Sequence, residues 1–309
     1  MKNSLLNWFL PAVVLLVLAS PKLAAQTPTD AIMMDKGQLC LAAIYGHDTW
    51  DEYWEGTLKR SNGNIGTFTR QSVSGMFSLG ITDRINVLGA LPWMKTSASA
   101  GQQKGVQGLQ DWGIWVKARA IEFQLGPGSL GFYPVLGLTG PASNYLADYM
   151  PFSLGLGSVE GSLRGILIYE LDKGVYLRGH YAYHLRSNTT IERDYYYTTH
   201  GVYSNEVDMP NAATYGATLG ALVINNSLKI EATYDGLKTL GGFDIRRNDA
   251  GFPSNKMIFT RIGGSLQYYF PFAKGLSVLA SGGYVLSGRN VGQSKLVSGG
   301  VVYQFGLWK

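Results

Sequence analysis

The segment from Gly174 to Arg186, GVYLRGHYAYHLR, alternates strictly between two kinds of side chain. Successive side chains of a strand point to opposite sides, so this pattern predicts a strand with two unlike faces. One face carries Val175, Leu177, Tyr181, Tyr183 and Leu185, and the other carries Tyr176, Arg178, His180, His184 and Arg186. In a soluble protein the apolar face would need a covering core. No segment after the N-terminal apolar run has the helical periodicity that would supply one.

The same alternation recurs in about a dozen segments, and a closed sheet with lipid outside and a polar lumen accommodates every copy. The predicted strands cover residues 37–46, 67–81, 84–93, 110–123, 130–139, 153–171, 174–186, 212–224, 228–237, 258–270, 276–287 and 294–307. The sequence therefore predicts an all-β fold, a transmembrane antiparallel up-and-down β-barrel of about 12 strands.

The connections between the predicted strands alternate in length. Those after the second, fourth, sixth, eighth and tenth strands are short, and most of the others are long. Barrels of the outer membrane have short periplasmic turns and long outer loops. This alternation predicts a location in the cell outer membrane of a Gram-negative bacterium, with both termini in the periplasm.

The N-terminus has the layout of a secretory signal peptide. Lys2 precedes an apolar run over residues 5–18, and small residues follow at Ala24 and Ala25. A membrane-spanning helix is the alternative, but the run is short and Pro11 interrupts it. We expect a signal peptide over 1–25 and one barrel domain over 26–309. Loss of Lys2 and Lys22 lowers the formal charge from +5 to +3, which requires no nucleic-acid partner.

The C-terminal strand carries a second export signal. Val301, Tyr303, Phe305 and Leu307 share one face, and this resembles the final strand by which the barrel-assembly machinery recognises its clients. The expected partners are therefore that machinery, outer-membrane lipid and lipopolysaccharide. A small-molecule solute is added to these if the lumen is open.

Strand alternation assigns the charged residues to the lumen. A lysine or arginine on the lipid face at mid-bilayer costs about 2–4 kcal/mol. One charged residue therefore indicates which face of its strand is turned to the lumen. The predicted lumen-lining residues that could contact a solute are Arg70, Lys117, Arg119, Arg164, Arg178, His180, His184, Arg186, Lys229, Glu231 and Arg261. Glu160, Glu170 and Asp235 fall in the same phase. The prediction is a lumen with a net positive charge.

Two functions fit such a lumen. One is passive transport of small, aromatic or anionic molecules through a water-filled passage. The other is a structural or surface-binding barrel whose charged groups pair across a plugged interior. Twelve strands lie between the filled eight-stranded barrels and the open sixteen-stranded ones, so both functions stay open.

An enzyme is not expected. The sequence contains no nucleophile elbow, phosphate-binding loop or zinc motif, and no cofactor or metal site is predicted. His180 and His184 lie about 13 Å apart along a strand, too far to bind one metal ion readily. Cys40 is the single cysteine, so the chain forms no internal disulfide.

The predicted first and fourth loops are rich in aromatic and acidic residues. Aromatic rings at Trp50, Tyr53, Trp54, Tyr195, Tyr196 and Tyr197 either stack on a ligand or anchor the loops. The acidic group consists of Asp48, Asp51, Glu52 and Glu55. These four either bind a divalent cation or remain solvated loop charges.

Two stretches carry a family resemblance. The first, GITDRINV at residues 80–87 and continuing to Pro92, resembles the "YGLTDRxEV…xxP" hairpin of the MetA-pathway-of-phenol-degradation family of outer-membrane proteins. The second, GVQGLQDWGIWVKARA at residues 105–120, is similar to that family's "G-x-GD-x-x-x-x-x-KYR" strand. In it Asp111, Lys117 and Arg119 stand in the matching places.

The resemblance covers about a quarter of the chain and departs from the family at three points. Gln110 replaces a glycine, Ala118 replaces an aromatic residue, and the residues ahead of the turn are Phe77, Ser78 and Leu79. The resemblance implies an outer-membrane barrel, loosely tied to uptake of aromatic or hydrophobic compounds. Asp83 in the Thr-Asp-Arg turn stabilises a tight bend, so the motif is evidence about fold more than about substrate.

Overall fold

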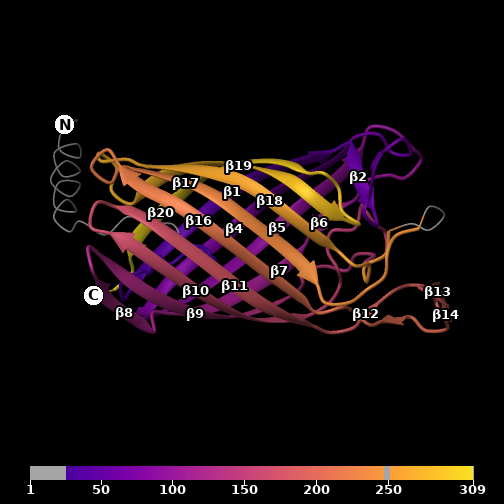
Figure 1. The fold of residues 1–309 in the computed structure, drawn as a ribbon, viewed down its shortest axis with the longest axis horizontal. Coiled ribbons are helices and arrows are strands. Elements are labelled where there is room, and N and C mark those ends of the chain that lie inside the picture. Colours follow the sequence, from indigo (N-terminus) through magenta and orange to yellow (C-terminus); the bar gives the residue numbers. More distant parts are fainter. Residues whose placement is uncertain (1–25, 247–250, 309) are drawn as a thin grey trace, which may run out of the picture.

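Twelve antiparallel strands close into a barrel (Figure 1). The structure is a computed structural model that describes residues 26–246 and 251–308, and the predicted signal peptide at 1–25 lies outside them. In chain order the barrel strands are β1 (Gln38–Trp50), β4 (Phe68–Thr82), β5 (Ile85–Ala98), β7 (Asp111–Ala118), β9 (Gly128–Pro141), β10 (Glu160–Leu171), β11 (Val175–Arg186), β16 (Ala212–Val223), β17 (Leu228–Thr239), β18 (Ile258–Tyr269), β19 (Leu276–Arg289) and β20 (Lys295–Gly306). Strands adjacent in the sequence pair with one another, and β20 pairs with β1 to close the wall. The predicted all-β up-and-down barrel is confirmed.

Some strand boundaries differ from the prediction. The fourth strand is interrupted: β6 (Gln107–Leu109) precedes β7, and β8 (Ile121–Leu125) follows it along the same neighbouring strands. The sixth strand begins at Glu160, because the chain before it folds over the mouth of the barrel. There Phe152 is fully buried against Phe68, with ring centroids 5.6 Å apart.

Short turns lie at one end of the barrel and long loops at the other (Figure 1). At the short end Gly174, with φ of +79°, allows the tight turn between β10 and β11. At the long end the loops form small hairpins, β2 (Glu52–Glu55) with β3 (Leu58–Ser61), β12 (Thr189–Thr190) with β15 (Glu206–Val207), and β13 (Tyr196–Tyr197) with β14 (Gly201–Val202). The backbone N–H of Leu307 donates to Gly37, so β1 begins where β20 ends, at the short end.

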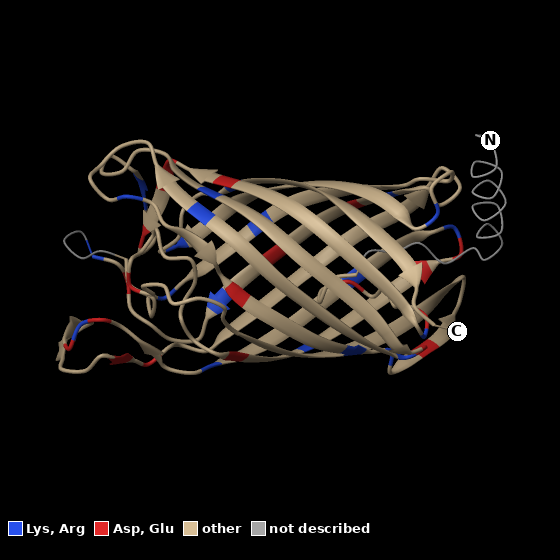
Figure 2. Ribbon diagram, turned by 180° about the vertical axis from the view of Figure 1, so that it is seen from behind, with Lys and Arg blue, Asp and Glu red and all other residues tan. Residues whose placement is uncertain are grey.

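The two faces of the wall differ as the alternation requires. On β11, Leu177 and Leu185 point outward and are 58% and 60% exposed, whereas Arg178 on the inner face is 7% exposed. Figure 2 shows long uncharged stretches of strand between the two ends of the barrel. Among the described residues no helix is long and apolar enough to cross a membrane.

Residues 26–36 lie inside the barrel near the short end, and we call them the inner loop. Met34 is buried against Cys40 and Val302, and the backbone of Gln26 hydrogen-bonds to the same cysteine. The segment therefore folds back on itself, with its tip at Pro28 and Thr29. The strand prediction gave no sign of this loop, because strand alternation begins only after it.

Candidate functional site

A buried lysine fastens the inner loop to the barrel wall. Lys117 on β7 is completely buried, and its Nζ donates to the carbonyl of Thr27 at 2.7 Å and to the carbonyl of Asp30 at 2.9 Å. The same ammonium lies 2.8 Å from the Asp30 carboxylate. A buried charge is tolerated when it is paired and its hydrogen bonds are satisfied, and Lys117 meets both conditions.

The residues that carry the family resemblance gather around the inner loop. The side-chain amides of Asn86 and Gln26 hydrogen-bond at 3.0 Å, and the backbone N–H of Lys36 donates to the Asp83 carboxylate at 3.1 Å. Arg119 donates to the carbonyl of Asp83 at 2.8 Å and pairs with Glu122. In this chain the Thr-Asp-Arg turn thus holds the base of the inner loop.

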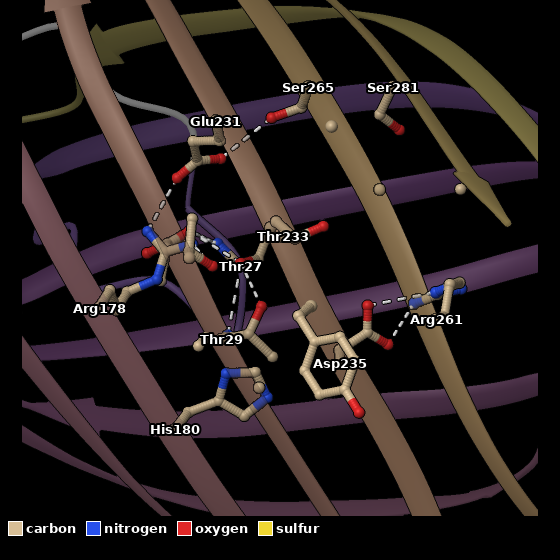
Figure 3. Close-up of a pocket in the computed structure, with 18 of the residues that line it drawn as sticks. Thr27, Thr29, Arg178, His180, Glu231, Thr233, Asp235, Arg261, Ser265 and Ser281 are labelled. Carbon is tan, nitrogen blue, oxygen red and sulfur yellow. Dashed lines mark hydrogen bonds and ion pairs between the residues drawn. The ribbon is translucent and has the colours of Figure 1, made fainter. Parts of the chain in front are cut away.

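A cavity of about 510 Å³ lies inside the barrel against the tip of the inner loop. Its titratable lining residues are Asp30, Arg164, Arg178, His180, Lys229, Glu231, Tyr215, Tyr234, Asp235 and Arg261. Figure 3 shows several of these side chains converging from β11, β17 and β18. Much of the remaining lining, on β18, β19 and β20, is glycine and serine, including Gly263, Ser265, Ser281, Gly283 and Ser298. We call this space the inner cavity.

Glu231 is the centre of the hydrogen bonding in the inner cavity. Its carboxylate accepts from Tyr176 at 2.7 Å, from Arg178 at 2.9 Å and from Ser265 at 3.0 Å. Lys229 Nζ lies 3.8 Å away. These contacts join β11, β17 and β18, and they neutralise one carboxylate with two cations.

Two further ion-pair groups lie closer to the long-loop end. Arg261 pairs with Asp235 at 2.8 Å. Glu160 accepts from His184 at 2.6 Å and from Arg186 at 2.9 Å, and the other nitrogen of His184 lies 2.9 Å from the hydroxyl of Thr214. This second group joins β10, β11 and β16.

Arg164 differs from the other predicted lumen cations. Its Nη1 is buried and has no hydrogen-bond partner in the described part of the chain. The acid that acts on it electrostatically is Glu160, whose oxygens are occupied by His184 and Arg186. Arg164 therefore brings an unpaired charge to the inner cavity.

A second cavity, of about 480 Å³, lies at the long-loop end, and we call it the outer cavity. Trp50 and Phe68 stack in its wall with ring centroids 5.1 Å apart. Arg70 also lines it and is held by Asp48 at 2.6 Å. Phe259 and Arg261 line both cavities. Phe259 and Arg261 therefore stand between the two spaces, one of which lies at the mouth and the other against the inner loop.

The acidic loop residues are each matched by a cation. Asp48 pairs with Arg70, Glu52 with Lys59, Glu55 with Arg60, and Asp51 lies 3.8 Å from Lys295. Asp51 and Glu52 are 59% and 43% exposed, as solvated loop charges are, whereas Asp48 and Glu55 are mostly shielded from solvent beside their arginines. In the loop between β17 and β18, at the same end of the barrel, hydrogen bonds from Arg289 and Asn290 lower the pKa of Asp244 to about 2.

Sequence reasoning missed the polar inner-loop residues Gln26, Thr27 and Asp30. The Thr-Pro-Thr-Asp stretch at residues 27–30 is a turn signal that could have indicated a compact loop, but it does not say where the loop lies. Thr218 was missed as well, and Tyr176 was assigned to the inner face but not to the site. Both matter only through their contacts with residues on neighbouring strands.

Comparisons with known proteins bear on the fold. No protein-family model and no curated protein matches the chain. The COG4313 outer membrane channel from Pseudomonas putida F1 superposes with a TM-score of 0.66 at 15% identity, over 91% of this chain and 100% of that chain. The beta domain of the Bordetella autotransporter Brka gives a TM-score of 0.52 at 15% identity, over 87% and 100%. The chain has the fold of an outer-membrane β-barrel. At this level of identity the likeness extends to fold alone.

Proposed function

We propose that this protein is an outer-membrane channel for passive transport of small molecules, with aromatic or anionic solutes preferred. The observation that carries the proposal is the pair of cavities that share Phe259 and Arg261 in their walls, one at the mouth and one against the inner loop. A polar, partly charged interior is suited to hydrated solutes, whereas a filled core would exclude them. The aromatic wall at Trp50 and Phe68 suits a planar solute.

The lumen-lining role proposed from the sequence concerns two groups of residues. Those at the cavities are Arg70, Arg164, Arg178, His180, Lys229, Glu231 and Arg261. The second group does not line the cavities, and its contacts hold the inner loop, a turn or neighbouring strands. It consists of Lys117, Arg119, His184 and Arg186. We propose that only the first group contacts solute.

The cellular setting is proposed on the same grounds. Residues 1–25 act as a signal peptide, and the barrel resides in the outer membrane with its short turns and termini in the periplasm. Lipid and lipopolysaccharide surround it, and the barrel-assembly machinery inserts it. The resemblance to the MetA-pathway-of-phenol-degradation family, a family of outer-membrane proteins, supports this setting. In this chain the motif residues hold the base of the inner loop.

Bilayer conductance tests the proposal. The chain from residue 26 onward, refolded in detergent and added to a planar bilayer, is expected to give discrete current steps in potassium chloride. A tenfold salt gradient then gives the anion preference from the reversal potential. Complete absence of current from correctly folded, heat-modifiable protein would rule out a channel.

A structural barrel is the second candidate, and one observation favours it. The inner loop occupies the short end of the barrel and is tied there by the fully buried Lys117. If the loop never leaves, the lumen is closed on one side. In that case the folded protein gives no current, and removing the loop creates one.

A further inference from the structure

Arg164 is placed in the wall of the inner cavity with spare hydrogen-bonding capacity. It projects from β10 at the position paired with Ala182 of β11, so a small side chain lies opposite it. Its buried Nη1 donates to no described group. Because Nη1 itself is closed off from solvent, what Arg164 offers to a ligand in the cavity is a guanidinium charge without an acidic partner in the described chain.

A second guanidinium in the same cavity is also incompletely used. Arg178 donates through Nη1 to Glu231 and through Nη2 to Thr218 at 3.3 Å, but its Nε is buried without a partner in the described chain. His180 lines the cavity beside the two arginines, and both act on its imidazole electrostatically. Figure 3 shows Arg178 and His180 on the same strand near the tip of the inner loop.

The other cations nearby are already committed. Lys117 is bonded to the inner loop, and Arg261 is paired with Asp235. Arg178 and Lys229 both contact Glu231, at 2.9 and 3.8 Å. Among the lining cations of the described chain, Arg164 is therefore the one without an acidic partner. A carboxylate, which accepts hydrogen bonds at both oxygens, suits a guanidinium.

The charge of the cavity limits the ligand to a monoanion. Asp30, Glu231 and Asp235 line the same space, so a dianion such as a phosphate monoester would face three carboxylates. Four cations, Arg164, Arg178, Lys229 and Arg261, line the space with these three acids, so one negative charge balances the lining. The volume of about 510 Å³ is within the usual range for small-molecule sites and leaves space for an organic body beside the carboxylate.

We propose that Arg164 and Arg178, with His180 beside them, form a binding site for the carboxylate of a small organic monoanion inside the inner cavity. This inference rests on the proposed function and deepens it, because a weak site on the path would select carboxylates among the solutes that pass. The glycine- and serine-rich part of the lining leaves room for the rest of the molecule.

Acetate is the probe, and binding is measured apart from transport. Refolded protein in detergent micelles is titrated with acetate, and in parallel with inorganic phosphate, by isothermal titration calorimetry. The variants are Arg164→Gln and Arg164→Lys. The latter keeps the charge and serves if the glutamine variant does not fold. The matched control is Lys295→Gln, which removes one positive charge from a side chain on the outer face of β20 that is 60% exposed.

The wild type is expected to bind acetate more tightly than phosphate, and Arg164→Gln is expected to weaken acetate binding at least tenfold. Arg164→Lys should fall between them, and Lys295→Gln should match the wild type. Equal acetate affinity in the wild type and Arg164→Gln, or tighter binding of phosphate, would overturn the site. Acetate binding without any bilayer current would instead refute the channel and leave the site intact.

Discussion

Lys117 is the residue on which the position of the inner loop depends most. Its ammonium contacts the Asp30 carboxylate and two loop carbonyls, and it has no exposure to solvent. Removing one member of such a buried pair leaves the other charge unpaired, which costs about 3–5 kcal/mol. Strand alternation predicted that Lys117 faces the lumen, but it could not predict the ion pair with Asp30, because Asp30 is 87 residues away in the chain.

Replacing Lys117 by methionine is therefore expected to release the inner loop. The unpaired Asp30 would favour water over the docked position, so the Ile32 amide, which donates to Asp30 at 3.0 Å, should exchange its hydrogen at least a hundredfold faster. Hydrogen-exchange mass spectrometry of the protein in vesicles measures this. The Asp30→Asn/Lys117→Met double variant should recover most of the protection. Unchanged exchange in the single variant would contradict the role given to this pair.

At the scale of elements, the barrel strands were predictable and the inner loop was not. Alternation depends on which face a side chain occupies, and every long strand has one face on the apolar exterior. This is why the strand over residues 174–186 was assigned almost to the residue as β11 (Val175–Arg186). The inner loop has no such exterior face, so its sequence carries no periodic signal.

The candidate site was only partly predictable for a related reason. Alternation identified Arg164 and Arg178 as inward-facing, but it could not show that Arg178 is paired with Glu231 while Arg164 is not. Pairing depends on the register between β11, β17 and their neighbours, and on side chains from strands distant in the chain. The predicted sixth strand also began too early, at residue 153, because residues 153–159 contain apolar residues that pack in the mouth loops.

Deleting the tip of the inner loop tests its effect on passage. A chain lacking residues 27–31 is expected to show a single-channel conductance at least twice that of the intact chain, because the tip lines the inner cavity through Thr27, Thr29 and Asp30. Planar-bilayer recording measures the step size. Because the deletion leaves Lys117 without its carboxylate, the deleted chain also carries Lys117→Met.

An equally long deletion at residues 197–201, in the β13–β14 hairpin of the long-loop end, is the control and should leave the step size unchanged. Equal conductance of the intact chain and the chain without residues 27–31 would show that the inner loop does not limit the current.

At the scale of the whole molecule, the outer face must match lipid while the inner face meets water. Leu136 on β9 is outward-facing and 61% exposed, and Ser281 on β19 lines the inner cavity. We expect Leu136→Arg to lower the free energy of unfolding in vesicles by about 2–4 kcal/mol, because the charge enters the hydrocarbon layer. Ser281→Arg should change it by less than about 1 kcal/mol and reduce the conductance instead.

Urea unfolding in vesicles, followed by tryptophan fluorescence, separates the two variants. A Leu136→Arg barrel as stable as the wild type would mean that this face does not contact lipid. A Ser281→Arg barrel with undiminished current would place the path elsewhere.

In the proposed channel, the uneven lining of the inner cavity has a consequence for how a molecule would cross it. The charged side chains come largely from β10, β11 and β17, whereas glycine and serine dominate on β18 to β20. The resulting electric field runs across the passage as well as along it. A passing molecule with a dipole would be turned sideways, its negative end toward β10 and β11. Because the wall is itself handed, mirror-image solutes would then cross at different rates.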